Sequence, residues 1–139
     1  MPGSQIFAPF VTMLLLTLVV WIVLYIRRIS FLMSNRIAAQ RLTTPEKLVE
    51  IIPGEVNSPA NNLKNLFELP VAFYALCIYL YVTGNVDSVY LTAAWVFTGL
   101  RIVHSAIHCT VNIVMARFLV YMAGALALWF MVLRAALQL

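Results

Sequence analysis

Residues Ile6 to Ile26 form an apolar stretch that carries no charged side chain and ends at the pair Arg27 and Arg28. A helix needs about 20 such residues to cross the hydrocarbon core of a bilayer. The stretch lacks the basic start and the small-residue cleavage site of a secretory signal. We therefore predict that it is a membrane-spanning helix that the protein retains.

The rest of the chain is similarly apolar. It is 63% hydrophobic and 10% charged, with a mean hydropathy of +0.95, so it can cover its surface only in lipid. All spans must be helical, because an open sheet leaves backbone groups unpaired in lipid. No Gly, Ser or Pro-rich linker divides the chain, which predicts one all-α domain over residues 1–139, a four-helix transmembrane bundle. The predicted spans are Ile6 to Ile26, about Asn65 to Val82, about Val89 to His108, and about Ala116 to Leu137.

Several local signals predict where helices begin and bend. Ser58 and Pro59 are typical of a cap and a first helical position, so the second long helix is expected to begin there, before the membrane does. Pro70 lies inside this helix and is expected to kink it, which would free the carbonyl of Leu66 near Glu68.

Three other helix starts have cap signals. Residues 43–46, Thr-Thr-Pro-Glu, predict a short surface helix in the long connection between the first two spans. Residues 84–88 predict a tight turn with Asp87 or Ser88 as cap, and Asn112 is a candidate cap for the last span.

The basic residues predict the orientation. Of the nine Lys and Arg, only Arg134 lies at the end of the spans opposite to the others. The positive-inside rule then places the long connection in the cytosol and both termini on the other side. The net charge of +4 is accounted for by this topology and by contact with anionic lipid, and it implies no nucleic-acid partner. We expect a bacterial inner membrane rather than the endoplasmic reticulum.

Two polar stripes enter the apolar spans near the same predicted cytosolic end. Ionisable groups at membrane depth normally have a partner and a function. Their spacings of three and four residues place the members of each stripe on one helical face. The first stripe is Asn61, Lys64 or Asn65, and Glu68; the second is Arg101, His104, His108 and Asn112, extended by Arg117 and Tyr121. Several cations and one carboxylate at a helix start favour an anionic ligand.

Two other interpretations use the same residues. In a purely structural one, Glu68 pairs with Arg101 or Arg117 to hold the helices together. In the other, His104 and His108 are four residues apart on one helix and bind a metal ion, a role that the neighbouring arginines oppose.

The two cysteines suggest no disulfide framework. Cys77 lies in the middle of a span and Cys109 near the end of another. We interpret Cys109 as a small buried apolar residue rather than a reactive thiol.

The ordered motifs Asn65-x-x-Glu68-x-Pro70, Arg101-x-x-His104 and Arg117-x-x-x-Tyr121 resemble the membrane-associated proteins of eicosanoid and glutathione metabolism (MAPEG). The resemblance extends over roughly residues 6 to 137. It implies a homotrimer of four-helix protomers that binds glutathione as cosubstrate between neighbouring protomers, on the cytosolic side.

The resemblance also implies roles for individual residues. Arg117 would stabilise the glutathione thiolate, and Tyr121 and His104 would add hydrogen bonds. Asn65 and Glu68 would hold the polar and ammonium groups. The carboxylates would face Lys64, Arg101 and one of Arg27 or Arg28.

The chain departs from the family pattern at three positions. Asn61 stands where many members have arginine, and His108 stands where several have tyrosine. Phe118 replaces the serine of the prostaglandin-isomerising branch. Phe118 thus disfavours prostaglandin isomerisation, and the resemblance then implies a conjugating or peroxide-reducing enzyme that acts on lipophilic electrophiles or lipid hydroperoxides. The alternative, which Asn61 would mark, is a non-catalytic member that presents lipid to a partner.

Overall fold

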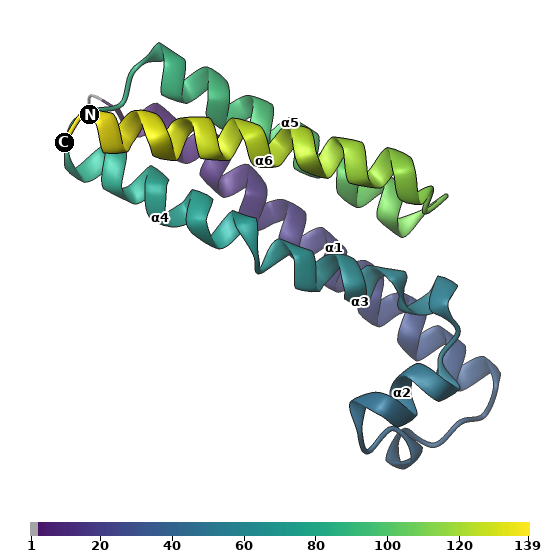
Figure 1. The fold of residues 1–139 in the computed structure, drawn as a ribbon. Coiled ribbons are helices and arrows are strands. Elements are labelled where there is room, and N and C mark those ends of the chain that lie inside the picture. The colour runs from purple at the N-terminus through teal and green to yellow at the C-terminus, as the bar shows by residue number, and fades with distance from the viewer. Residues whose placement is uncertain (1–2) are drawn as a thin grey trace.

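The computed structural model describes residues 3–139, and within that range all regular secondary structure is helical (Figure 1). This confirms the all-α prediction. The α-helices are α1 (Phe7–Ser34), α2 (Pro45–Ile51), α3 (Gly54–Leu66), α4 (Leu69–Val82), α5 (Ser88–Cys109) and α6 (Val114–Leu137). Two short 3-10 helices, η1 (Ser4–Ile6) and η2 (Ala39–Arg41), precede α1 and α2.

Three helical segments of the described chain are long and apolar enough to cross a membrane: Ser4–Ser34, Gly54–Val82 and Val114–Leu137. The remaining predicted span, the third along the chain, coincides with α5, whose polar residues lower its hydropathy. Its charged and imidazole side chains are nevertheless buried inside the protein rather than turned outward. The crossing of the membrane by α5 therefore stays a prediction, and its polar face is explained by contacts with neighbouring helices.

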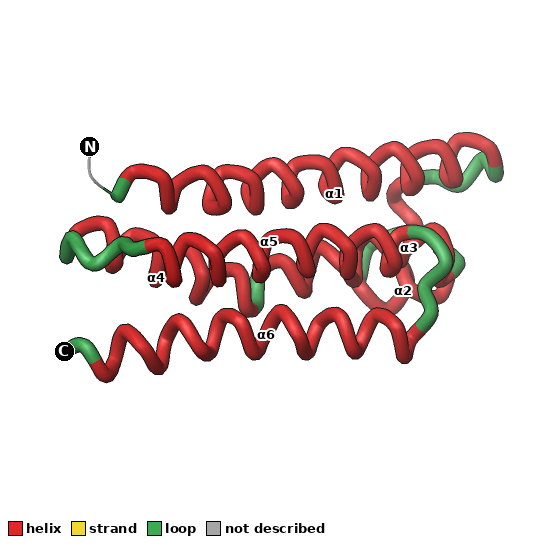
Figure 2. Tube along the Cα trace, turned by 90° about the horizontal axis from the view of Figure 1, so that it is seen from above, coloured by secondary structure: helices red, strands yellow, loops and turns green. Residues whose placement is uncertain are grey.

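The long helices run side by side, with α1 and α6 at opposite edges and α3, α4 and α5 between them (Figure 2). The α5–α6 pair packs along its length, as does the pair of α1 and α3. Toward the end that carries α2, the two pairs diverge (Figure 1). The beginning of α1 and the end of α6 lie at the opposite end of the bundle, at its two separate edges (Figure 2). The placement of both chain ends on one side of the membrane stays a prediction.

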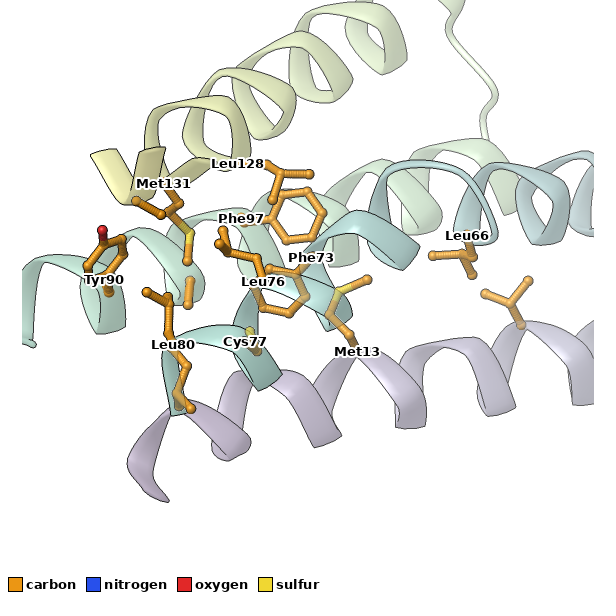
Figure 3. Close-up of a cluster of buried hydrophobic side chains, with 14 residues drawn as sticks. Met13, Leu66, Phe73, Leu76, Cys77, Leu80, Tyr90, Phe97, Leu128 and Met131 are labelled. Atoms are coloured by element: carbon orange, nitrogen blue, oxygen red, sulfur yellow. The ribbon is translucent and has the colours of Figure 1, made fainter. Parts of the chain in front are cut away.

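A hydrophobic core closes the end of the bundle near the chain termini (Figure 3). The rings of Phe73 on α4 and Phe97 on α5 lie 4.7 Å apart between their centroids. Met13 from α1 and Leu128 from α6 belong to the same cluster, so four helices contribute side chains to this core. Cys77 is buried in this core, where it packs as an apolar side chain.

The prediction that the second long helix begins at Ser58 is wrong. Helix α3 begins at Gly54, with Pro53 at the cap position, so Pro59 lies inside it. Proline has no N–H to donate to the carbonyl four residues earlier, here that of Glu55. The Ser58 hydroxyl donates to this carbonyl instead, at 3.2 Å, and so the helix tolerates the proline.

The kink predicted at Pro70 is a full break. Helix α3 ends at Leu66 and α4 begins at Leu69, with Glu68 at its cap position in a non-helical conformation (φ −99°, ψ −101°). Pro70 then lies in the first turn of α4, where its missing N–H removes no helical hydrogen bond. The break exposes Glu68 at the surface of the chain.

Two predicted caps are confirmed. The Thr44 hydroxyl accepts a hydrogen bond from the Lys47 N–H and begins α2. Asp87 Oδ1 accepts one from the Tyr90 N–H at 2.9 Å and begins α5. Both capping side chains follow the preference for hydroxyl or carboxylate oxygens at this position.

The Asp87 carboxylate also binds Arg134, near the end of α6. The two side chains form a paired contact at 2.9 and 2.6 Å, and the guanidinium lies 4.3 Å from the centre of the Tyr90 ring. The Tyr90 hydroxyl donates to Gln138 Oε1 at 2.6 Å. Hydrogen bonds from Arg134 and from the Tyr90 N–H lower the pKa of Asp87 from 3.8 to about 2. These hydrogen bonds connect the α4–α5 turn and the start of α5 to the end of α6.

We predict that Ser58→Ala lowers the free energy of unfolding by about 0.5–1.5 kcal/mol, because the Glu55 carbonyl loses its donor. In a Pro59→Ala background the restored backbone N–H should take over, and Ser58→Ala should have little effect. A double-mutant cycle from denaturant unfolding in detergent measures this difference. Equal effects in both backgrounds would contradict the compensation.

We predict that Asp87→Asn lowers the thermal unfolding midpoint by a few degrees at pH 6, because asparagine retains the cap but loses the ion pair. A carboxyl with a lowered pKa stabilises the fold above its unfolded value of 3.8, and this contribution disappears as the pH falls through about 2. The difference between variant and wild type should therefore shrink between about pH 4 and pH 2. A difference independent of pH would rule out the ion pair as its cause.

Candidate functional site

A buried cation lies at the centre of the polar residues. Arg101 of α5 is completely buried, and its Nη2 donates to the backbone carbonyl of Asn65 at 3.1 Å. Its guanidinium carbon lies 5.5 Å from the centre of the Tyr121 ring on α6. The end of α3 and the first turns of α6 therefore meet at one charged side chain of α5.

His104 connects α5 to the start of α6. Its Nδ1 lies 3.2 Å from the backbone carbonyl of Arg117. A carbonyl only accepts hydrogen bonds, so Nδ1 carries the proton and the other ring nitrogen, Nε2, is an acceptor. The His104 ring lies 5.7 Å from the rings of both Tyr121 and His108, between centroids. We refer to Arg101, His104, His108, Arg117 and Tyr121 as the α5–α6 cluster.

The prediction that Asn112 caps the last helix is wrong. Helix α6 begins at Val114 and has Ile113 at its cap position without a side-chain hydrogen bond. Asn112 instead has a left-handed backbone (φ +49°) and its N–H bonds the Ile107 carbonyl, which closes the end of α5. Its side chain accepts a hydrogen bond from Arg117 instead, with Arg117 Nη1 and Asn112 Oδ1 2.6 Å apart. Asn112 thus positions the Arg117 side chain and does not cap α6.

The α5–α6 cluster contains buried nitrogen atoms that have no hydrogen-bond partner in the described chain. They are Nε and Nη1 of Arg101, Nε2 of His104 and Nδ1 of His108. Buried polar atoms are normally paired, and each unpaired one is costly. The two Arg101 nitrogens can therefore donate to acceptor groups of a polar ligand, and His104 Nε2 can accept from a donor of that ligand.

No carboxylate of the described chain neutralises the cluster. Within residues 3–139 the one ion pair joins Arg134 to Asp87, at the other end of the bundle. Glu68 is exposed and lies close enough to Arg101 to interact electrostatically, but not at ion-pair distance. The structural pairing of Glu68 with Arg101 or Arg117 is thus not formed within this chain.

The predicted polar stripe of the second helix is mostly at the surface. Asn61, Lys64 and Glu68 are exposed, whereas Asn65 is half-buried and binds Arg101 through its backbone. Asn61, Lys64 and Asn65 belong to α3, but Glu68 lies in the break before α4, so the predicted stripe does not continue along one helical face.

Sequence reasoning missed the residue of α3 that does face α5. Asn62 is completely buried, and its Oδ1 accepts from the Ser105 hydroxyl at 3.3 Å. Its Nδ2 donates to Cys109 Sγ at 3.6 Å. Cys109 is half-buried and hydrogen-bonded, which corrects its interpretation as a buried apolar residue. The spacing of four between Ser58, Asn62 and Leu66, all buried, is the signal that marks this inner face.

The two neighbouring arginines at the end of the first span line different cavities. Arg28 lies with Asn61 and Lys64 in a cavity of about 440 Å³. Arg27 lines another of about 590 Å³ together with Cys109 and Asn112. Successive residues of a helix point about 100° apart, which separates the two side chains. The predicted glutathione-binding residues thus fall into separate groups within one chain.

The metal interpretation lacks ligands. His104 and His108 are adjacent, but within residues 3–139 no three His, Cys, Asp or Glu side chains gather as a metal site would require. Arg101 lies in the same cluster, and its charge opposes a cation.

The fold and the site define a helical membrane protein with a cationic cluster inside its bundle. A sequence model of the MAPEG family matches residues 6–137, nearly the whole chain. The chain therefore belongs to the MAPEG family, whose membrane proteins include glutathione-related transferases and commonly use glutathione. No curated protein and no solved structure gave a significant match.

We predict that His104→Asn preserves the attachment of α6, because the asparagine amide nitrogen takes about the place of the imidazole Nδ1. His104→Ala should raise hydrogen exchange of residues 114–121, since the Arg117 carbonyl loses its partner. Hydrogen-exchange mass spectrometry of the two variants measures this. His108→Ala serves as the control, and an equal rise there would show that the bond from His104 is not responsible.

Proposed function

We propose that this protein is a membrane-embedded, glutathione-dependent transferase or peroxidase that acts on lipophilic electrophiles or lipid hydroperoxides. The observation that supports this most strongly is the α5–α6 cluster, with its buried cation, its unpaired donors and no carboxylate to neutralise it. Glutathione has two carboxylates, one ammonium and one thiol. Charge-assisted hydrogen bonds to its carboxylates would satisfy the arginine nitrogens.

We assign the chemical role to Arg117. It is half-buried at the start of α6 and is held there by its hydrogen bond to Asn112. A guanidinium beside the sulfur favours thiolate over thiol, and the thiolate is the nucleophile. Tyr121 lies under Arg101 and near His104, where its hydroxyl would donate to the sulfur or to a bound substrate.

The remaining contacts would come from the α3–α4 junction. Asn65 and Glu68 would hold the polar backbone and the ammonium of the tripeptide. Because Glu68 is exposed in the single chain, we propose that it meets the site of a neighbouring protomer in a homotrimer. The family membership and this uncovered carboxylate support this assembly.

Two reactions fit this site. In transfer, the thiolate attacks an electrophilic carbon and forms a carbon–sulfur bond, while the displaced electron pair takes up a proton. In peroxide reduction, two glutathione molecules give up two electrons and two protons to a hydroperoxide, forming the disulfide, an alcohol and water. Both begin from the same stabilised thiolate.

The surface beside the cluster supports a lipophilic second substrate. The first turns of α6 expose Met115, Phe118, Leu119 and Met122 around Arg117 and Tyr121. Such a surface is suited to lipid, so a hydrophobic electrophile would reach the thiolate from the bilayer. The distribution of Lys and Arg supports a site on the cytosolic side, and we place the protein in a bacterial inner membrane.

We predict that glutathione binds saturably to the purified protein and shows the ultraviolet absorption of a thiolate. Arg117→Gln should abolish this absorption while some binding remains, because Arg101 and the other donors are intact. Calorimetry and difference spectroscopy in detergent measure the two effects.

Arg134→Gln removes the same charge from the other end of α6 and is the matched control. A thiolate signal that persists in Arg117→Gln would remove this residue from the mechanism. No binding at millimolar glutathione would reject the enzyme and favour a lipid-presenting protein of the same fold.

A further inference from the structure

A second cationic cavity lies at the end of the bundle where α1 and α3 meet the connection that contains α2. It has a volume of about 440 Å³ and is lined by residues of all three segments. Arg28 comes from α1, Asn57 and Lys64 come from α3, and residues 42–45 together with Leu48 and Val49 form the third wall. Figure 1 shows α2 beyond the main body of the bundle, beside the ends of α1 and α3.

The charge of this cavity is entirely positive. Arg28 and Lys64 are its charged lining residues, and no carboxylate lines it. Arg28 Nη2 donates to Asn57 Oδ1 at 3.2 Å, which fixes the guanidinium toward α3. Its Nε is buried and has no partner in the described chain. A positioned arginine with a spare donor, beside a lysine, suits the oxygens of a phosphate.

The wall that the connection provides is mostly apolar. Leu42, Pro45, Leu48 and Val49 line it, together with two threonines, Thr43 and Thr44. Arg28 itself follows directly after the apolar stretch that ends at Ile26, so the cavity lies at the level where lipid headgroups begin. Its ligand should therefore have both a phosphate and an apolar part.

We propose that this cavity binds the headgroup phosphate of an anionic phospholipid. The guanidinium and the Lys64 ammonium contact the phosphate oxygens, and the apolar wall covers the glycerol and the first part of an acyl chain. Inorganic phosphate offers the same oxygens but leaves the apolar wall uncovered, which favours the lipid.

The lipid site is separate from the α5–α6 cluster. It contains none of the residues Arg101, His104, Arg117 or Tyr121. The proposal therefore does not depend on glutathione chemistry. Its structural consequence is that one ligand connects α1, α3 and the connection around α2, and so holds that connection against the bundle.

The test is a titration of delipidated protein in neutral detergent, followed by native mass spectrometry. The ligands are dioleoyl phosphatidylglycerol, dioleoyl phosphatidylcholine, inorganic phosphate and glutathione. We expect saturable binding of phosphatidylglycerol, weakened at least about tenfold by Arg28→Gln because a charged hydrogen-bond donor is lost. Arg41→Gln is the matched control, because Arg41 lies in the same connection but lines another cavity, and it should leave binding unchanged.

A second variant, Val49→Glu, tests the same site independently in case Arg28→Gln does not fold. Val49 is 66% exposed, so Val49→Glu should fold normally and repel the phosphate. Phosphatidylglycerol should also slow hydrogen exchange of residues 42–49 in wild type and not in Val49→Glu.

Three outcomes would overturn the proposal. Equal losses in Arg28→Gln and Arg41→Gln would mean a general effect of surface charge. Binding of inorganic phosphate without lipid binding would reject the lipid. Displacement of the lipid by glutathione would assign Arg28 to the tripeptide, whereas failure of glutathione to bind anywhere would leave the lipid site intact.

Discussion

The burial of the Arg101 charge is the constraint on which the polar half of this bundle depends. A buried guanidinium is costly unless its donors are satisfied. One acceptor is provided by the break in the second long helix. Because α3 ends at Leu66, the Asn65 carbonyl has no partner four residues on, and it accepts instead from Arg101 and from the Glu68 N–H. The end of a helix also carries partial negative charge, which stabilises a cation there.

The break itself is marked in the sequence by Pro70. A proline cannot donate to the carbonyl four residues earlier, here that of Leu66, and α4 uses it in its first turn. The break leaves α3 and α4 as two helices on either side of the charged layer. On one side, Phe73 and Phe97 belong to a tightly packed apolar core. On the other, polar residues fill the space between helices. The break between α3 and α4 thus separates an apolar, packed end of the bundle from a polar end.

Hydropathy and capping chemistry were sufficient to predict most of the fold. The bounds of α5 and α6 agree with the predicted spans within two residues, and the caps at Thr44 and Asp87 form as expected. The errors at Ser58 and Asn112 have a common cause, because each residue uses its side chain for a contact other than the cap that its type favours. Ser58 compensates for an internal proline, and Asn112 binds Arg117. The preference of a residue type for a capping position therefore does not show which hydrogen bond its side chain forms, because that depends on the neighbouring residues.

The site was harder to predict, because neighbouring helical residues point in different directions. Asn61 and Asn62 differ by one position, yet one is exposed and the other is completely buried against α5. Arg27 and Arg28 separate into different cavities for the same reason. Spacing identifies which residues share a face, but not which face meets another helix. The positive charges that predict the orientation of the chain are consequently not one interchangeable group. Arg101 is enclosed by helices, where its unpaired donors suit the polar ligand that we propose. Arg28 lines a separate cavity, where we propose that a lipid supplies the anion.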